Sequence, residues 1–112
     1  MSLLNMIFGS VDSDKVKVLP AQEYQQTLKE KKGKIVDVRT PQEFASGHIK
    51  GAKNIDHYSN DFVERFSGFN KEDALFIYCR SGARSRAAAS KLVKAGFNEI
   101  YDLQGGFMRW SR

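Results

Sequence analysis

The stretch LFIYCRSGARSRAAAS, residues 75–90, constrains the fold of this chain more than any other segment. An apolar run without polar alternation ends at Cys79, a loop of small residues and arginines follows, and an alanine-rich segment comes next. Such an apolar run is typical of a strand covered on both faces in a parallel sheet. The alanine-rich segment predicts a helix that packs closely on that sheet. The sequence therefore places its only cysteine between a buried strand and a helix.

The rest of the chain alternates between predicted strands and helices. Strands are expected at 15–19, 34–39, 52–55, 74–78 and 99–103. Helices are expected at 20–33, 40–47, 61–66 and 85–94, and a terminal helix or cap at 105–110. This order predicts an α/β fold: a single domain with a mainly parallel central sheet of about five strands and helices on both faces.

Particular residues mark the ends of the predicted helices. Pro20 is expected to open the first helix and Gly33 to close it. Thr40 is the expected N-cap of the second helix, with a proline directly after it. The third helix is expected to bury three apolar side chains, those of Phe62, Val63 and Phe66.

A chain of 112 residues suits one domain with one core. We assign this domain to residues 15–112 and treat residues 1–14 as an N-terminal extension. The extension is apolar at its start but lacks a basic n-region, which leaves a packed amphipathic turn, a trimmed leader or an expression remnant as interpretations. No apolar run approaches the ~20 residues that a membrane span needs. A cytoplasmic location is therefore the default expectation, and a periplasmic one after leader removal stays open.

The net charge of +5 is unevenly spread, because residues 79–95 hold five basic side chains and no acidic one. This excess predicts an anionic substrate or partner. The basic segment lacks the interleaved aromatic residues and groove-reading motifs of nucleic-acid-binding proteins, so nucleic acid is not expected as a partner. A single cysteine excludes an internal disulfide and a Cys-x-x-Cys pair. His48 and His57 lie outside any metal-ligand pattern, and structural roles are expected for both.

The loop after Cys79 has the features of an anion-binding nucleophile site. Ligands of open α/β sheets bind beyond the carboxyl ends of the strands. Gly82 can take a positive φ, so the successive amide groups of the loop can point inward as an anion cradle at the start of a helix. Such surroundings favour the thiolate, which is the nucleophilic form of cysteine. Arg80 and Arg84 are placed to hold an anionic donor by paired hydrogen bonds.

Residues outside this loop are expected to support it. Asp37 and Arg39 end a predicted strand, and Arg39 has the spacing of a local ion pair with Glu43. Phe107 and Trp110 near the C-terminus are expected to pack against the core.

Three motifs resemble those of the rhodanese family, sulfurtransferases that carry sulfane sulfur as a cysteine persulfide. CRSGAR resembles the family's active-site loop. IVDVRTPQEFASGHIKGAKNI, residues 35–55, is similar to its Asp-x-Arg…Glu-Phe…Gly-His-Ile-x-Gly-Ala-x-Asn-Ile segment. LQGGFMRW, residues 103–110, resembles its closing Gly-Gly-x-x-x-Trp element. The three motifs occur in the family's order, and the resemblance spans most of the chain from residue 15 to residue 110.

The resemblance implies a single-domain rhodanese with Cys79 as the nucleophile. Cys79 would take the outer sulfur of thiosulfate or of a persulfide donor and pass it to a thiol or to cyanide. The resemblance also implies a substrate-binding loop, which consists of Arg80, Ser81, Gly82, Ala83, Arg84 and Ser85. Asp37 and Arg39 would support this loop, and no metal or organic cofactor is needed.

Two alternatives use the same cysteine. Cysteine phosphatases, including the Cdc25 type, have a Cys-x5-Arg signature, but here Ser85 occupies the arginine position and Arg84 comes one residue earlier. This shorter loop is expected to be too tight for phosphate, and arsenate reduction is disfavoured for the same reason. The second alternative is a sulfur carrier or binding module without turnover, which would exchange sulfur with a sulfur-relay partner protein. The sequence does not separate carrier from enzyme.

Overall fold

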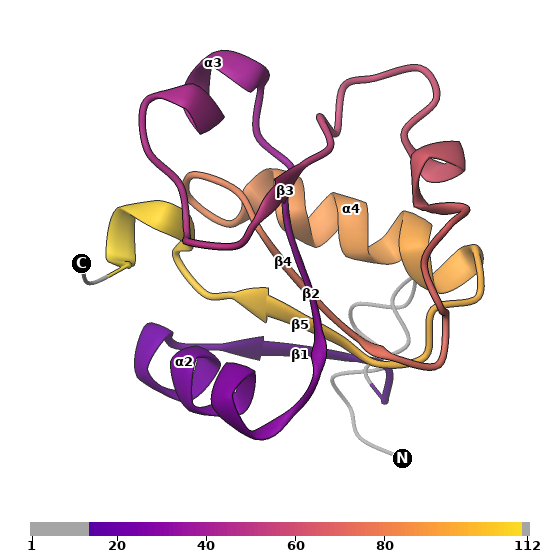
Figure 1. Ribbon diagram of the computed structural model, residues 1–112, viewed down its shortest axis with the longest axis horizontal. Coiled ribbons are helices and arrows are strands. Elements are labelled where there is room, and N and C mark those ends of the chain that lie inside the picture. Colours follow the sequence, from indigo (N-terminus) through magenta and orange to yellow (C-terminus); the bar gives the residue numbers. More distant parts are fainter. Residues whose placement is uncertain (1–13, 111–112) are drawn as a thin grey trace.

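The computed structural model describes residues 14–110 and shows a five-stranded parallel sheet with helices on both faces (Figure 1). The strands lie in the order β1-β5-β4-β2-β3. Their bounds are Val16–Leu19 for β1, Gly33–Asp37 for β2, Lys53–Asn54 for β3, Ala74–Tyr78 for β4 and Ile100–Leu103 for β5. The predicted α/β fold with a mainly parallel sheet is confirmed.

In residues 14–110, three α-helices and two 3-10 turns connect and cover the strands. The α-helices are α2 (Ala21–Glu30), α3 (Pro41–Ala45) and α4 (Ala83–Lys94), and the turns are η1 (Val63–Phe66) and η2 (Gly106–Arg109). Figure 1 shows α2 and α4 on opposite sides of the sheet. Each packs into its own hydrophobic cluster, α2 through Tyr24 and α4 through Ala88, Ala89 and Leu92. All five residues of β4 are buried between the two clusters, as the unbroken apolar run predicted.

The second predicted helix begins as expected, whereas the end of the first differs. Thr40 caps α3 in a reciprocal capping box with Glu43. Helix α2 ends before Lys31, which is extended, so the prediction that Gly33 closes this helix is wrong. Gly33 is instead the first residue of β2, where an added Cβ would lie less than 3.0 Å from the carbonyl oxygen of Ala74. The glycine is needed because β2 and β4 approach closely at this point.

The segment 61–66 forms only the short turn η1. Phe62 and Phe66 are buried as expected, but Val63 is 38% exposed, so its predicted burial is wrong. Phe62 and Phe66 are four positions apart and reach the same side of the turn, while Val63 directly follows Phe62 and points elsewhere.

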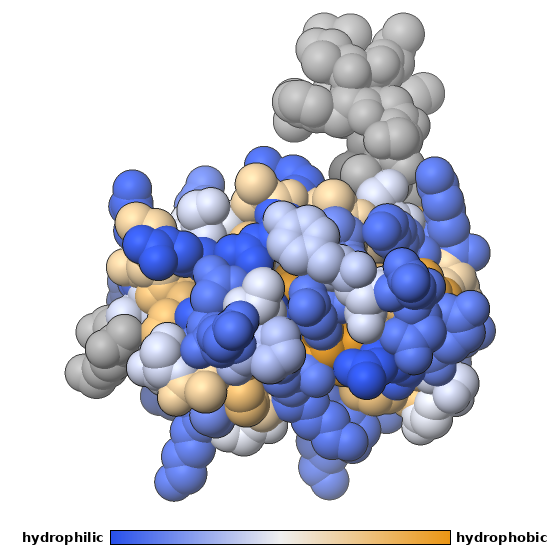
Figure 2. Space-filling model, turned by 90° about the horizontal axis from the view of Figure 1, so that it is seen from above, coloured by the Kyte–Doolittle hydropathy of each residue, from blue (hydrophilic) through white to orange (hydrophobic). Residues whose placement is uncertain are grey.

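The topology gathers the functional segments at one edge of the molecule. Because the strands are parallel, the carboxyl ends of β2, β4 and β5 share this edge, and the loop after β4 lies between its two neighbours. The face seen in Figure 2 is mainly hydrophilic, with hydrophobic side chains visible in a few recesses. Within residues 14–110 no helix is long and apolar enough to cross a membrane. The interpretations offered for the extension 1–14 concern residues that, apart from Asp14, lie outside the described part.

Candidate active site

Cys79 follows β4 directly, and the backbone after it curls round the sulfur atom. Gly82, with a φ of 109°, turns the chain into α4. The amide groups of Gly82 and Ser85 donate hydrogen bonds to Cys79 Sγ at 3.1 and 3.3 Å. Cys79 is only 1% exposed. The thiol therefore lies at the N-terminus of a 12-residue helix with two backbone donors aimed at its sulfur.

The predicted binding loop forms one continuous turn, but its side chains point in different directions. Ser81 and Ala83 are exposed, while Gly82 and Ser85 are buried. A side chain at Gly82 would be strained by the positive φ and would contact the backbone of Gly105.

Arg84 is held by a partner far away in the sequence. Its guanidinium donates two hydrogen bonds to the carboxylate of Glu43, at 2.7 and 2.9 Å. These bonds lower the pKa of Glu43 to about 2 and raise the pKa of Arg84. The expected ion pair between Arg39 and Glu43 is wrong. Arg39 precedes the N-cap of α3, so the four-residue spacing does not bring the two side chains together as it would inside a helix.

Arg39 instead forms a buried ion pair with Asp37. Its guanidinium lies 2.6 Å from Asp37 Oδ2 and also donates to the carbonyl oxygen of Gly47 at 2.6 Å. The carbon centre of the guanidinium is 4.6 Å from the ring centroid of Phe107. Through these contacts Asp37 and Arg39 connect the end of β2 to the loop after α3 and to η2.

The turn η2 docks on the backbone of the cysteine loop. The amide of Phe107 donates to the carbonyl of Cys79 at 2.8 Å, and the amide of Met108 donates to the carbonyl of Arg80 at 3.1 Å. Gly106, with a φ of 66°, allows this approach. Phe107 is buried and Trp110 packs against the same cluster as Tyr24, which confirms the expected packing of the C-terminal aromatic residues.

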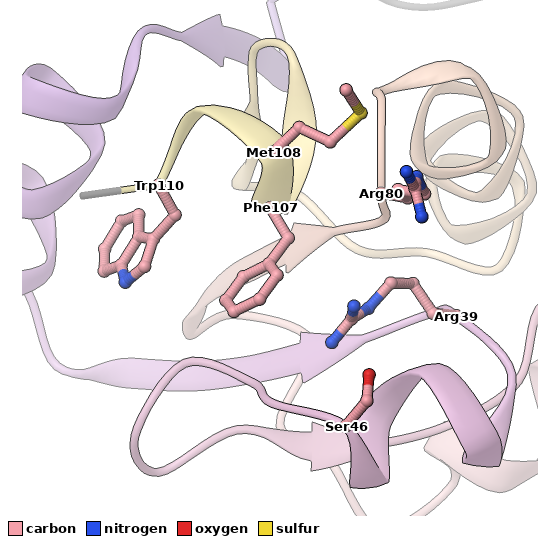
Figure 3. A pocket seen from close by; sticks show the side chains of 6 residues that line it. All are labelled: Arg39, Ser46, Arg80, Phe107, Met108 and Trp110. Atoms are coloured by element: carbon pink, nitrogen blue, oxygen red, sulfur yellow. The ribbon is translucent and has the colours of Figure 1, made fainter. Parts of the chain in front are cut away.

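Beside the loop lies a cavity of about 510 Å³ (Figure 3). Its lining residues are Arg39, Ser46, Arg80, Phe107, Met108 and Trp110. Figure 3 shows the Arg80 and Arg39 side chains on one side of this cavity and the ring of Phe107 beside them. Arg80 is exposed and forms no salt bridge with any described residue. The cavity thus presents a cation, Arg80, that no carboxylate in residues 14–110 compensates.

The sequence did not indicate the role of Asp102. This residue is fully buried in β5 and lies 2.6 Å from the hydroxyl of Ser85, which in turn lies 3.5 Å from Cys79 Sγ. Burial raises the pKa of Asp102 to about 6. The one available signal was an acidic residue inside the otherwise apolar strand IYDL.

Within the described part of the chain, neither His48 nor His57 belongs to a group of side chains that could bind a metal ion. His48 Nδ1 is 2.9 Å from the carbonyl oxygen of Phe44, the structural hydrogen bond that was expected. His57 packs against the Phe62 ring, and burial lowers its pKa. Among the residues from 14 to 110, no three His, Cys, Asp or Glu side chains are grouped so that they could hold a metal ion.

Comparison with known proteins supplies the family. Residues 20–112 match the model of the Rhodanese-like domain. The chain is 37% identical over 91 residues to thiosulfate sulfurtransferase GlpE of Pseudomonas aeruginosa (strain LESB58), covering 80% of each protein. It is 42% identical over 77 residues to thiosulfate sulfurtransferase GlpE of Stutzerimonas stutzeri (strain A1501), covering 68% of each. The crystal structure of a rhodanese-like domain protein from Staphylococcus aureus superposes with a TM-score of 0.74 at 31% identity, over 85% of this chain and 91% of that one. With this loop, this sheet and these relatives, the chain belongs to the rhodanese-like domain family.

Proposed function

We propose that the protein is a sulfurtransferase that moves sulfane sulfur from thiosulfate or a persulfide donor to a thiophilic acceptor through a persulfide on Cys79. The observation that carries this proposal is the pair of amide groups, of Gly82 and Ser85, that point at Cys79 Sγ. Backbone donors at a helix N-terminus stabilise negative charge on whatever atom they surround. The relatives named thiosulfate sulfurtransferase add support from outside the structure.

The transfer consists of two nucleophilic displacements at sulfur. The Cys79 thiolate attacks the outer sulfur of thiosulfate, the S–S bond of the donor breaks, and its electron pair leaves with sulfite. The sulfur stays on the protein as a Cys79 persulfide anion. An acceptor such as cyanide then attacks the outer sulfur of the persulfide, which releases thiocyanate and returns the thiolate. With a thiol as acceptor, the product is the acceptor's persulfide.

The size of the loop favours sulfur over phosphate as its ligand. Both amide donors reach the single Sγ atom within 3.3 Å, and Arg84 is already bound by Glu43. A phosphoryl group needs donors for three oxygen atoms beyond the nucleophile. The compact cradle therefore fits the one additional sulfur atom of a persulfide better than a phosphoryl group.

The anionic donor is assigned to the cavity beside the loop. Arg80 faces this cavity without a carboxylate partner among the described residues, so its charge is available to a sulfonate-like group. Arg84 contributes positive charge near the sulfur, although its hydrogen bonds are shared with Glu43. We therefore expect both arginines to bind the anionic donor, with Arg80 contributing more than Arg84.

The deciding experiment is the intact mass of the purified protein after thiosulfate, then after cyanide, beside a Cys79→Ser variant. We expect a gain of one sulfur atom that cyanide removes and that the variant does not show. Because Cys79 is the only cysteine of the chain, no second thiol can contribute to the gain. A sulfur gain that persists in Cys79→Ser, or no gain from thiosulfate and from a persulfide donor, would overturn the proposal. Persulfide formation without turnover of small acceptors would assign the protein to the sulfur carriers.

A further inference from the structure

Three buried side chains form a line that ends at the reactive sulfur. Asp102 of β5, Ser85 of α4 and Cys79 after β4 have exposed fractions of 0%, 0% and 1%. Ser85 Oγ lies 2.6 Å from Asp102 Oδ1 and 3.5 Å from Cys79 Sγ. A hydroxyl group therefore joins a carboxyl group and a thiol that solvent barely reaches.

The direction of the Ser85 hydroxyl proton determines which of the three side chains donates a hydrogen bond and which accepts one. Its possible acceptors include Asp102 Oδ1 at 2.6 Å and the carbonyl oxygen of Gly82 at 3.2 Å. An ionised carboxylate at the shorter distance is the stronger acceptor. The proton then points at Asp102, and the lone pairs of Ser85 Oγ accept a hydrogen bond from the Cys79 thiol.

We propose that Asp102 receives the proton of the Cys79 thiol through Ser85, an inference that rests on the proposed function of Cys79. The S–H bond breaks as its proton passes to Ser85 Oγ, while the original O–H bond of Ser85 breaks as that proton passes to Asp102 Oδ1. The products are a thiolate, an intact serine hydroxyl and a neutral carboxylic acid. No electron is exchanged and no further reactant is required. The Ser85 proton now points at the sulfur and donates to the thiolate, or to the persulfide that follows.

The electrostatics of the line favour one negative charge rather than two. Two anions in this buried region would repel each other, so the charge rests either on Asp102 or on the sulfur. Asp102 Oδ2 is buried without a hydrogen-bond partner in the part of the chain that the structure describes. A carboxylate with one oxygen unsatisfied accepts a proton readily, and burial sets the pKa of Asp102 at about 6, close to neutral pH.

The other charged or titratable groups around the line are few. Arg86 on α4 acts on Asp102 and opposes the rise of its pKa. Arg84, also on α4, interacts with Cys79. Tyr24 on α2 faces Asp102 from the other side of the sheet, and its pKa is raised well above the usual value, so its phenol stays neutral. Asp102 is therefore the carboxylate that takes part in the line, and it acts on the sulfur as a positioning residue through Ser85.

The test is the rate at which iodoacetamide alkylates Cys79 in the full chain, followed by intact mass from acidic to mildly alkaline pH. In the wild type we expect two steps, because Cys79 and Asp102 share their protons. The first step, near the pKa of Asp102, removes one proton from the line and leaves a single negative charge shared between the carboxyl group and the sulfur. The second step leaves both groups ionised. Asp102→Asn cannot take up the proton and should show a single step. A two-step profile in Asp102→Asn, or a single step in the wild type, would refute the relay.

A second pair of variants keeps the test independent of the folding of Asp102→Asn. Ser85→Ala should lower the alkylation rate of Cys79 on the plateau after the first step about tenfold. This is the effect of losing one hydrogen bond to a charged group. Ser85→Thr keeps the hydroxyl and should restore the plateau. Asp61→Asn makes the same charge change at the exposed partner of Arg65 and should leave the profile unchanged. An equal loss in Ser85→Ala and Ser85→Thr would show that packing, and not the hydroxyl, controls the thiol.

Alkylation needs no sulfur donor, so the two proposals fail separately. If the relay profile is seen but thiosulfate adds no sulfur, the relay stands and the sulfurtransferase assignment falls. If sulfur is loaded and Asp102→Asn has the wild-type alkylation profile, the function stands and the relay falls.

Discussion

Glu43 and Arg84 are 41 positions apart in the sequence, yet their side chains meet in two hydrogen bonds of 2.7 and 2.9 Å. This pair fastens α3 to the start of α4 beside the reactive sulfur. It also compensates the charge of Arg84, whereas Arg80 has no such partner among the described residues. The two arginines of the CRSGAR loop are therefore in different electrostatic situations, which leads to different expectations for their removal.

Arg80→Ala should raise the KM for thiosulfate about tenfold with little change in kcat, because the loss of one charge-assisted contact to the donor costs roughly 1.5 kcal/mol. Arg84→Ala should raise this KM by less and leave the amount of persulfide formed unchanged, since its guanidinium is already bound to Glu43. Steady-state kinetics with thiosulfate measures both effects. Arg65→Ala, which removes an exposed arginine paired with Asp61, is the matched control and should match the wild type. An equal rise in KM for Arg65→Ala would mean that net charge alone attracts the donor.

The Glu43–Arg84 pair should make stability depend on pH in the acid range. The folded-state pKa of Glu43, about 2, is below the unfolded value, so its stabilising contribution is complete above about pH 4.5. It is lost as the pH falls from about 4.5 towards 2. After allowance for the partial exposure of the pair, we expect a loss of about 1–2 kcal/mol. Urea unfolding of the wild type and of Glu43→Gln at several pH values measures this loss. The difference in unfolding free energy between the two proteins should shrink with acidification. A difference independent of pH would contradict this account.

The buried pair of Asp37 and Arg39 should be strongly coupled. Asp37→Asn leaves the Arg39 guanidinium, which is 4% exposed, without its counter-charge and should cost about 3–5 kcal/mol of unfolding free energy. Replacing both side chains, as in Asp37→Leu with Arg39→Met, removes both charges and should cost less than either single change. Denaturant titrations of Asp37→Leu, Arg39→Met and the double variant complete the cycle. Additive losses would show that the two residues act independently.

The fold and the loop could be predicted because their signals are local. The apolar run of β4, the N-cap Thr40 and the positive-φ Gly82 each specify the chain next to them, whatever the rest of the molecule does. Parallel strands then bring their carboxyl ends to one edge. These local features are enough to predict Cys79 at the start of a helix.

The choice of partners could not be predicted in this way. Arg39 and Glu43 have helix-like spacing, but the helix begins after Arg39, and each residue pairs with a different side chain. The contact between Asp102 and Ser85 joins β5 to α4 and depends on how closely α4 packs on the sheet. Gly33 looked like a helix end because glycine is common there, while the reason for it, the carbonyl of Ala74, lies on another strand. Ion pairs and close contacts of this kind depend on tertiary packing.

Gly106 should be indispensable for both the stability and the activity of the loop. A Cβ at this position would lie less than 3.0 Å from the carbonyl groups of Arg80 and Cys79, in addition to the strain of a positive φ. Gly106→Ala should therefore cost about 2–5 kcal/mol, the sum of the conformational strain and the steric overlap. It should also slow sulfur transfer several-fold, because η2 can no longer dock on the two carbonyls and the cysteine loop shifts.

Gly51→Ala is the matched control: its φ is also positive, at 88°, but nothing lies within 4 Å of the added methyl group. This control should lose only about 1–2 kcal/mol and retain wild-type kinetics. Thermal unfolding and donor kinetics of the two variants separate strain from overlap, and equal losses in both would show that η2 does not hold the cysteine loop in place.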